Sequence, residues 1–484
     1  MPPLPPGPRW LATLLAGAAL ASPAAGAPPP EGTCPAISAQ PGAGVAEDAS
    51  PTRLPEGALL LHDDLLALRH LLPEEVWQLR HAFFYDGMRL EIGPCHRRYP
   101  TADFYAAATE RFAGKARLDA DGNLHDYVAG LPFPPAAIDP AAPDAAMRWA
   151  WNFDKRYRGA GPVGRFRLID FPSRMGAIQV YEGSFFWLQS RERADLAATG
   201  YSIPGVDESL WIGGGRFDQP MDARHLAWHQ IRSPETETAY TNSDQTFVYV
   251  PAMRKIRRSA TSWVDGFFTP RYRVSGDGRG GGVPVGGGSY GPTDAVYPAA
   301  AESTQPSEYL RRGFATLTLR PNAYVWRLRG EREVLAPINA YHPGYPETRN
   351  RNYGPSGLSV ASDRWDVRQA VVIEGLARFR DQFKTLTIYL DYQTQQPLYF
   401  VLRADRGRIL DVGIAVHRFS GDVAGYPEFS EGVKANVFDP VAEVFYVMSD
   451  DSGWHRESWD VKSVPTPEAV QRRFTATDFL TRGR

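Results

Sequence analysis

Few of the residue patterns that support catalysis occur in this sequence. It contains no G-x-S-x-G nucleophile elbow, no H-E-x-x-H zinc motif and no phosphate-binding P-loop. His225 and His229 are spaced like two metal ligands, but the glutamate of zinc proteases is missing between them and no third ligand is evident. Gly276, Gly278 and Gly281 match the G-x-G-x-x-G pattern only because their segment is saturated with glycine. The sequence therefore predicts no catalytic residue, no cofactor and no metal site.

Two charged stretches are candidate binding elements. As a strand, the segment SDRWDVRQ places Arg364, Asp366 and Arg368 on one face, where they either pair with one another or form a polar cluster. The segment TFVYVPAMRKIRRSA places four cations directly after an apolar strand. These cations are either edge-strand charges that deter aggregation or contacts for an acidic headgroup or partner. The candidate headgroup or partner contacts are Arg254, Lys255, Arg257, Arg258, Arg364 and Asp366.

The overall charge argues against nucleic acid as the partner of the basic stretch. The chain of 484 residues has 53 Lys and Arg against 55 Asp and Glu, a formal net charge of -2. Proteins that bind nucleic acid usually carry a strong basic excess, because phosphate contacts supply most of their affinity. We therefore expect no nucleic-acid partner.

The N-terminus resembles a secretory signal peptide. Arg9 precedes a short apolar run that ends in small residues, which fits a cleavable signal over residues 1–27. The run is much shorter than the roughly 20 residues of a membrane-spanning helix. We therefore expect an exported protein in the periplasm, with the outer membrane as an alternative site of association. Cys34 and Cys95 then form one disulfide or remain two unpaired thiols.

The periodicity of apolar residues predicts a mainly β protein with flanking helices, of the α+β class. Residues 28–58 are rich in Pro, Gly and Ala, which predicts an extended arm. Residues 59–160 contain three amphipathic helical segments, PEEVWQLRHAFFYDG, PTADFYAAATERFAG and PDAAMRWAWNFDKRYRG. Residues 161–484 contain consecutive strands with short turns, a Gly-rich loop at 275–308 and a C-terminal helix. The predicted strands include HLAWHQIR, TFVYV, FATLTLR at Phe314–Arg320 and YVWRLR. This pattern predicts a large antiparallel sheet against which the helical segment packs.

Four motifs resemble one exported Gram-negative family, catalogued as domain of unknown function 1329. They are HDYVAGLPFP at 125–134, MRWAWNF at 147–153, DQTFVYVPAMRKIRR at 244–258 and YGPSGLSVASDRWDVRQAVVIEG at 353–375. The family is in turn similar to the lipoprotein carriers LolA and LolB and to outer-membrane sorting proteins. The resemblance implies a half-open antiparallel β-barrel wrapped over helices, with an apolar cavity. It also implies a transporter of the resistance-nodulation-division type as a partner. The N-terminal arm with Cys34 departs from the family pattern.

The resemblance implies a periplasmic carrier or binding protein for a lipid or other hydrophobic ligand, working between an inner-membrane transporter and the outer membrane. A concave sheet lined by large apolar side chains can bury acyl chains without a catalytic group. The alternatives are a non-catalytic accessory subunit that docks on an envelope complex, and an enzyme acting on an envelope substrate. The candidate cavity residues are Phe185, Trp187, Phe247, Tyr249, Leu317, Leu319, Trp326 and Phe400.

Overall fold

The computed structural model describes residues 28–37, 52–171, 178–206, 208–250, 255–259, 318–344, 353–378, 383–448, 453–465 and 470. The predicted signal peptide, the Gly-rich loop and the C-terminal helix beyond residue 470 lie outside these residues. Within the described part of the chain, no helix is both long enough and apolar enough to cross a membrane.

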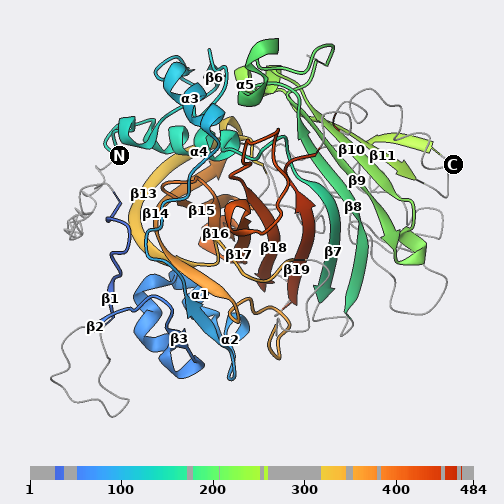
Figure 1. Cartoon of the computed structure of the whole chain (residues 1–484). Helices are drawn as coiled ribbons and strands as arrows, with labels where there is room; N and C mark the ends of the chain where they lie inside the picture. Colours follow the sequence, from blue (N-terminus) through green and yellow to red (C-terminus); the bar gives the residue numbers. More distant parts are fainter. Residues whose placement is uncertain are drawn as a thin grey trace, which may run out of the picture.

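One large sheet of 15 described strands dominates the molecule (Figure 1). Its long strands pair antiparallel in two runs of consecutive strands, which join where β7 pairs with β19. The first run is β7 (Val163–Phe171), β8 (Gln179–Gln189), β9 (Trp211–Gln219), β10 (Ala227–Arg232), β11 (Gln245–Val250) and β12 (Lys255–Ser259). The second is β13 (Tyr324–Ala336), β14 (Arg364–Ala377), β15 (Thr385–Asp391), β16 (Pro397–Arg403), β17 (Ile409–Phe419), β18 (Phe438–Val447) and β19 (Gly453–Lys462).

The sheet stays open. Its two ends are formed by β12 and by the strands beside β14, and the described strands contain no pairing between β12 and β13. The short strand β4 (Leu90–Ile92) pairs parallel with β14, and β3 (Leu59–Leu60) pairs antiparallel with β4. Two small ribbons are separate, β1 (Ala36–Ile37) with β2 (Thr52–Arg53) and β5 (Arg117–Leu118) with β6 (Leu124–His125). The predicted mainly β fold with an open antiparallel sheet and few helices is therefore confirmed.

Helices cover both faces of the second run of strands. One core contains residues of the 3-10 helix at His62–Leu71, of α1 (Glu74–Gln78) and of α2 (Arg80–Phe83), and the other contains those of α4 (Ala145–Lys155). The strands supply both cores because side chains alternate along them: Phe400 lies in the α4 core, and its neighbour Val401 in the other. The remaining described α-helices are α3 (Asp103–Arg111) and α5 (Glu235–Thr238).

Two predicted elements differ from the structure. The helix expected over PEEVWQLRHAFFYDG is broken at Leu79, so that α1 and α2 are two short helices. The strand expected over Phe314–Arg320 is absent from its described part: at residues 318–320 the backbone forms only an isolated bridge. Here the Thr318 hydroxyl donates to Asp154, and the Leu319 carbonyl accepts from Arg232.

The chain before β13 joins the two runs of strands. Arg232, at the end of β10, donates to the carbonyl of Leu319 at 2.7 Å. Asn322 donates to the carbonyl of Thr236 in α5 at 2.8 Å, and Arg320 donates to the carbonyl of Asn242. These contacts connect strands that are distant in the order of the sheet, so the sheet is curved enough to bring them together.

Candidate ligand-binding face

A cluster of aromatic side chains covers one face of the first run of strands. The cluster draws no residue from a described α-helix, in contrast to the two cores on the second run. Side chains alternate between the two faces along β8, so that Phe185 and Trp187 lie on one face. Cross-strand pairing places Phe166 of β7 and Trp228 of β10 on the same face. Its aromatic members, all buried, are Phe166, Tyr181, Phe185, Trp187, Trp211, Phe217, Trp228 and Trp459. We call this set the aromatic face.

Glycines give the rings room to lie against the backbone. A Cβ atom added to Gly215 in β9 would lie 2.3 Å from Cη2 of Trp228, and one added to Gly183 would lie 2.7 Å from Cζ of Phe166. Both distances are below any real contact, so a larger residue would push the ring away. The glycines of β8 and β9 therefore fix the rings close to the sheet.

Two arginines stack on the tryptophans at one end of the aromatic face. The guanidinium of Arg158 lies 4.0 Å from the ring centre of Trp187, and that of Arg232 lies 4.8 Å from the ring centre of Trp211. Arg232 also forms an ion pair with Asp244 at 2.9 Å. Burial lowers the pKa of Arg158 to about 10. The aromatic face thus ends at buried cations that cation–π contacts hold in place.

A buried ionic cluster lies next to these arginines. Lys155, from the end of α4, places Nζ 2.5 Å from Oε2 of Glu192 and 3.9 Å from Oδ2 of Asp154, and it also contacts Glu237 of α5. Burial and the neighbouring Glu192 raise the pKa of Glu237 to about 8. Burial opposes ionisation of Asp154, but Lys155 and Arg232 lower its pKa below the ordinary value. The cluster ties α4 to the first run of strands.

Two indole donors of the aromatic face have no acceptor among the described residues. These are the Nε1 atoms of Trp187 and Trp228, whose side chains are both completely buried. A buried donor without an acceptor costs about 1–3 kcal/mol, so buried indoles usually have one. Trp365, in the core that contains α1 and α2, shows the usual arrangement: it donates to the carbonyl of Val360 at 3.1 Å.

Five of the predicted cavity residues fall into two buried clusters. Phe185 and Trp187 lie in the aromatic face, whereas Leu319, Trp326 and Phe400 lie in the core beneath α4. Leu317 lies outside the described residues.

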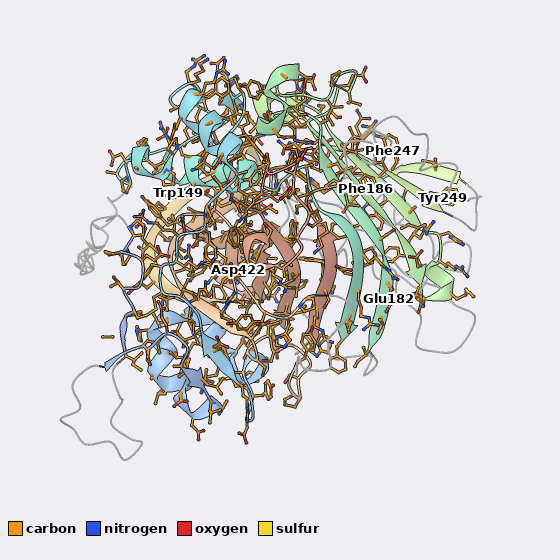
Figure 2. The ribbon with its side chains drawn as sticks, viewed as in Figure 1. Trp149, Glu182, Phe186, Phe247, Tyr249 and Asp422 are labelled. Atoms are coloured by element: carbon orange, nitrogen blue, oxygen red, sulfur yellow. A yellow bond between two sulfur atoms is a disulfide. The ribbon has the colours of Figure 1, made fainter. Side chains whose placement is uncertain are left out.

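The expectation of one common inner face does not hold for Phe247 and Tyr249. Across the paired strands, Phe247 and His229 lie in register with Phe186. Val248 and Trp228 lie in register with Phe185. By this register, Phe247 and Tyr249 project from the face opposite the aromatic face. Figure 2 labels both residues on the same part of the sheet as Phe186. The reason is the register between strands. Alternation within one strand separates its side chains into two sets, but it does not determine which set shares a face with the apolar residues of the neighbouring strand.

The predicted charged contacts are not brought together either. Lys255 and Arg257 are described only as backbone of β12, Arg258 is exposed opposite Phe247, and Arg254 lies outside the described residues. Arg364 and Asp366 lie at the other end of the sheet, in β14.

Asp366 belongs to a buried polar network between β14 and the chain after β4. The Tyr99 hydroxyl donates to its carboxylate, and Arg368 pairs with Asp391 at 2.7 Å. Burial raises the pKa of Asp366 to about 6, against the opposing effect of the Tyr99 hydrogen bond. Arg364 donates to the carbonyl of Asn339 at 2.9 Å. These partners make the network an internal connection between elements.

Cys34 and Cys95 form a disulfide in the structure, with Cα atoms 5.2 Å apart. The bond attaches the arm at residues 28–37 to the chain after β4. The amide of Gly32 also donates to the carbonyl of Cys95 at 2.8 Å, and the amide of Cys95 donates to Glu56 at 2.9 Å.

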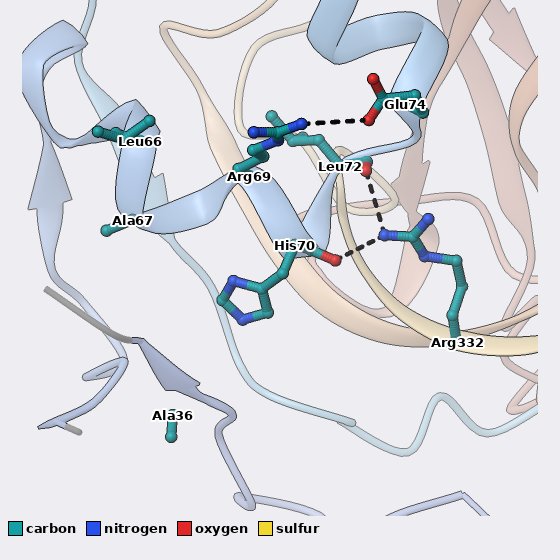
Figure 3. A pocket seen from close by; sticks show the side chains of 8 residues that line it. All are labelled: Ala36, Leu66, Ala67, Arg69, His70, Leu72, Glu74 and Arg332. Carbon is teal, nitrogen blue, oxygen red and sulfur yellow. Dashed lines mark hydrogen bonds and ion pairs between the residues drawn. The ribbon is translucent and has the colours of Figure 1, made fainter. Parts of the chain in front are cut away.

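A pocket of about 340 Å³ lies beside the 3-10 helix at His62–Leu71 (Figure 3). Arg332 from β13 donates there to the carbonyls of His70 at 2.6 Å and Leu72 at 3.1 Å, and Arg69 lies 3.9 Å from Glu74. Four of its eight lining residues are polar or charged, namely Arg69, His70, Glu74 and Arg332, so the pocket offers little to a hydrophobic ligand.

Sequence reasoning missed the residues that end the aromatic face. Asp154 and Lys155 directly follow the helical stripe MRWAWNF, and two charged residues at that position predict the solvent-exposed end of a helix. Their partners Glu192, Arg232 and Glu237 are distant in sequence, and no local pattern marks them.

A family model described as "Protein of unknown function (DUF1329)" matches residues 68–273 and 314–459, and no curated protein sequence matches the chain. One similar solved structure is a DUF1329 family protein from Desulfovibrio piger, with 9% identity over 70% of this chain and 99% of that chain and a TM-score of 0.39. A second is described as an outer membrane lipoprotein-sorting protein domain from Vibrio parahaemolyticus, with 11% identity, coverage of 66% and 91%, and a TM-score of 0.34. A third is a LolA superfamily protein from Nitrosomonas europaea, with 9% identity, coverage of 69% and 98%, and a TM-score of 0.33. At these TM-scores the similarities carry no argument about function.

Proposed function

The chain belongs to the DUF1329 family, as its four motifs predicted, and we propose that it is a carrier or binding protein for a lipid or other hydrophobic ligand. The observation that supports this proposal is the aromatic face. Its rings gather on one side of β7 to β10 and β19, where no described α-helix contributes to the cluster. A ligand bound on this face would bury its own methylene groups, and each buried methylene would contribute about 0.8 kcal/mol to the binding free energy. No catalytic group is needed for such a role.

The unpartnered indole donors support a ligand that is apolar but carries an acceptor. Trp187 and Trp228 lie two strands apart on the same face, and each offers one buried N–H group. An acyl ester or amide carbonyl would accept from such a donor and offset the cost of burying it. The proposed ligand therefore combines acyl chains with a carbonyl, as lipids do.

The proposed place of action is the periplasm. The signal-like N-terminus supports export, and the Cys34–Cys95 disulfide is compatible with an oxidising compartment. There the protein would pass its ligand between an inner-membrane transporter and the outer membrane. A transporter of the resistance-nodulation-division type is the proposed partner, on the basis of the resemblance alone.

The test is the lipid content of protein purified from the periplasm without detergent, measured by native mass spectrometry and by extraction. We expect a hydrophobic molecule bound to the wild-type chain. Trp228→Phe keeps most of the ring but removes the donor, and should lower ligand retention. Trp365→Phe is the matched control, because it removes an indole donor from the core on the other side of the sheet.

Two outcomes would contradict the carrier proposal. One is protein that neither carries nor accepts a hydrophobic molecule; a non-catalytic accessory subunit would then be the better explanation. The other is equal retention by the Trp228→Phe and Trp365→Phe variants and the wild type, which would remove the aromatic face from the binding site.

A further inference from the structure

A small cavity with a basic lining lies between the chain after α4 and the strands β17 and β18. Its polar lining residues are Arg156, Arg158, Gln396, His417 and Ser463, and the remaining ones are two prolines and a phenylalanine. None of its described lining residues is acidic. The cavity offers the centre of a water-sized sphere about 10 Å³, which is about what one water molecule or one small ion needs.

Two buried guanidinium groups are held in place at this cavity. Arg156 lies with its guanidinium 4.2 Å from the ring centre of Phe153, and it donates to the side chain of Gln396 at 3.0 Å. Arg158 donates to the carbonyl of Asp154 at 2.5 Å. Burial, and after it the neighbouring Arg158, lower the pKa of Arg156 well below its ordinary value, whereas Asp154 has a smaller opposite effect. The surroundings therefore oppose the positive charge of Arg156, and an anion in the cavity would stabilise it.

Two buried carboxylates lie next to lining residues, but neither lines the cavity. Asp154 accepts from the hydroxyl of Thr318 at 2.8 Å and lies 3.6 Å from Arg232. Asp439 accepts from the hydroxyl of Ser463 at 2.5 Å, and burial raises its pKa to about 6. An anion inside the cavity would therefore meet the two guanidinium groups and not a carboxylate.

The imidazole of His417 adds a neutral donor to the lining. The residue is 2% exposed, and its Nδ1 atom has no hydrogen-bond partner among the described residues. Burial and the neighbouring Arg156 lower the pKa of His417 to about 3, so the ring is neutral at pH 7 and carries one N–H group. Such a ring can donate to an anion without adding a third buried positive charge.

We propose that this cavity binds one chloride ion between Arg156, Arg158 and His417. Hydrogen bonds from guanidinium groups to an anion are charge-assisted, and they are stronger in a buried site than in water. The size of the cavity favours a monatomic anion over a phosphate or a carboxylate. The bound ion would offset the cost of burying two arginines side by side, and it would hold the chain after α4 against β17 and β18. This proposal goes beyond the carrier function, because the site needs no hydrophobic ligand.

The test is the chloride dependence of urea unfolding of the full chain, with gluconate replacing chloride so that the ionic strength stays constant. A ligand that binds only the folded chain shifts the equilibrium by mass action. A site with a dissociation constant of about 10 mM raises the ratio of folded to unfolded chain about fifteenfold between about 10 mM and about 300 mM chloride. We expect an increase of this size for the wild type.

Arg156→Gln should reduce this increase to about twofold or less. Arg148→Gln is the matched control, because it removes a guanidinium from α4 whose partner is Asp144 at 2.8 Å, outside the cavity. This control should keep the increase of the wild type. A crystal of the wild type grown in bromide gives a second measurement that does not depend on the folding of a variant. Its anomalous scattering should show a bromide ion in contact with Arg156 and Arg158.

Three outcomes would overturn the proposal. One is equal stability of the wild type at both chloride concentrations, with a water molecule as the occupant. Another is an Arg156→Gln variant that keeps the chloride dependence of the wild type, and the third is a bromide crystal without anomalous scattering in the cavity. Failure of the carrier proposal would look different: protein without a hydrophobic ligand should still be stabilised by chloride.

Discussion

Replacing Lys155 with methionine should strongly destabilise the fold. Its ammonium lies among Asp154, Glu192 and Glu237, and all four side chains are almost completely buried. Methionine fills a similar volume but leaves the buried carboxylates of Asp154 and Glu192, and the carboxyl group of Glu237, with one cation fewer. Removing one partner of a buried ion pair costs about 3–5 kcal/mol. We expect the free energy of unfolding to fall by this amount in urea at pH 7, followed by circular dichroism.

Glu237→Gln is the control that separates this reasoning from a general effect of mutating the cluster. With a pKa of about 8, Glu237 is largely protonated at pH 7, so the amide replaces a group that is already neutral. We expect the free energy of unfolding to fall by less than about 1 kcal/mol, which is within the range of conservative substitutions. A Lys155→Met variant as stable as the wild type would refute the argument, as would a Glu237→Gln variant that loses as much as Lys155→Met.

The pH dependence of stability follows from the same group. The folded-state pKa of Glu237 lies above its ordinary value of 4.5, so the folded chain holds the proton more tightly than the unfolded chain. Its contribution is complete below about pH 4.5 and is lost as the pH rises through about 8. The wild type should therefore lose stability across this window, and the Glu237→Gln variant should lose less. Parallel curves for the two proteins would contradict the assigned pKa.

Three further substitutions probe other parts of the fold. Replacing Cys34 and Cys95 together with serine should lower the free energy of unfolding by about 4 kcal/mol, because the disulfide closes a loop with a sequence separation of 61. The reduced wild type should show the same loss in urea unfolding. Tyr99→Phe removes the hydroxyl that donates to Asp366 and should cost about 1–3 kcal/mol at pH 7, with a smaller loss well below pH 6, where the carboxyl is protonated. Gly215→Ala should cost about 1–3 kcal/mol and shift the tryptophan fluorescence, because the new methyl group meets an indole ring; an unchanged spectrum and stability would argue against the close packing at this site.

Local patterns in the sequence were sufficient to predict the class of the fold. The alternation in TFVYV, HLAWHQIR and YVWRLR predicted strands that the structure contains as parts of β11, β10 and β13. The helical stripe of MRWAWNF likewise predicted α4, in which Trp149 and Phe153 are buried. Such patterns are local, because a strand or helix of a protein with a core must repeat its apolar residues at its own period.

The binding face could be predicted only in part. Phe185 and Trp187 were placed on one face by alternation within β8, which is a property of that strand alone. Phe247 and Tyr249 were assigned to the same face, but the register of β10 with β11 turns them to the other side. Register depends on the lengths and conformations of the connections, and a shift of one residue exchanges the faces of a whole strand.

The sequence by itself thus determined the family, the mainly β class and the residues that alternate within each strand. Only the tertiary structure decided that β7 pairs with β19, that Trp187 and Trp228 share a buried cluster to which no described α-helix contributes, and that Lys155 meets Glu192 and Glu237. The physical reason is the range of the interactions. Periodicity and propensity act over a few residues, whereas pairing between distant strands and buried ion pairs depends on how the whole sheet curves.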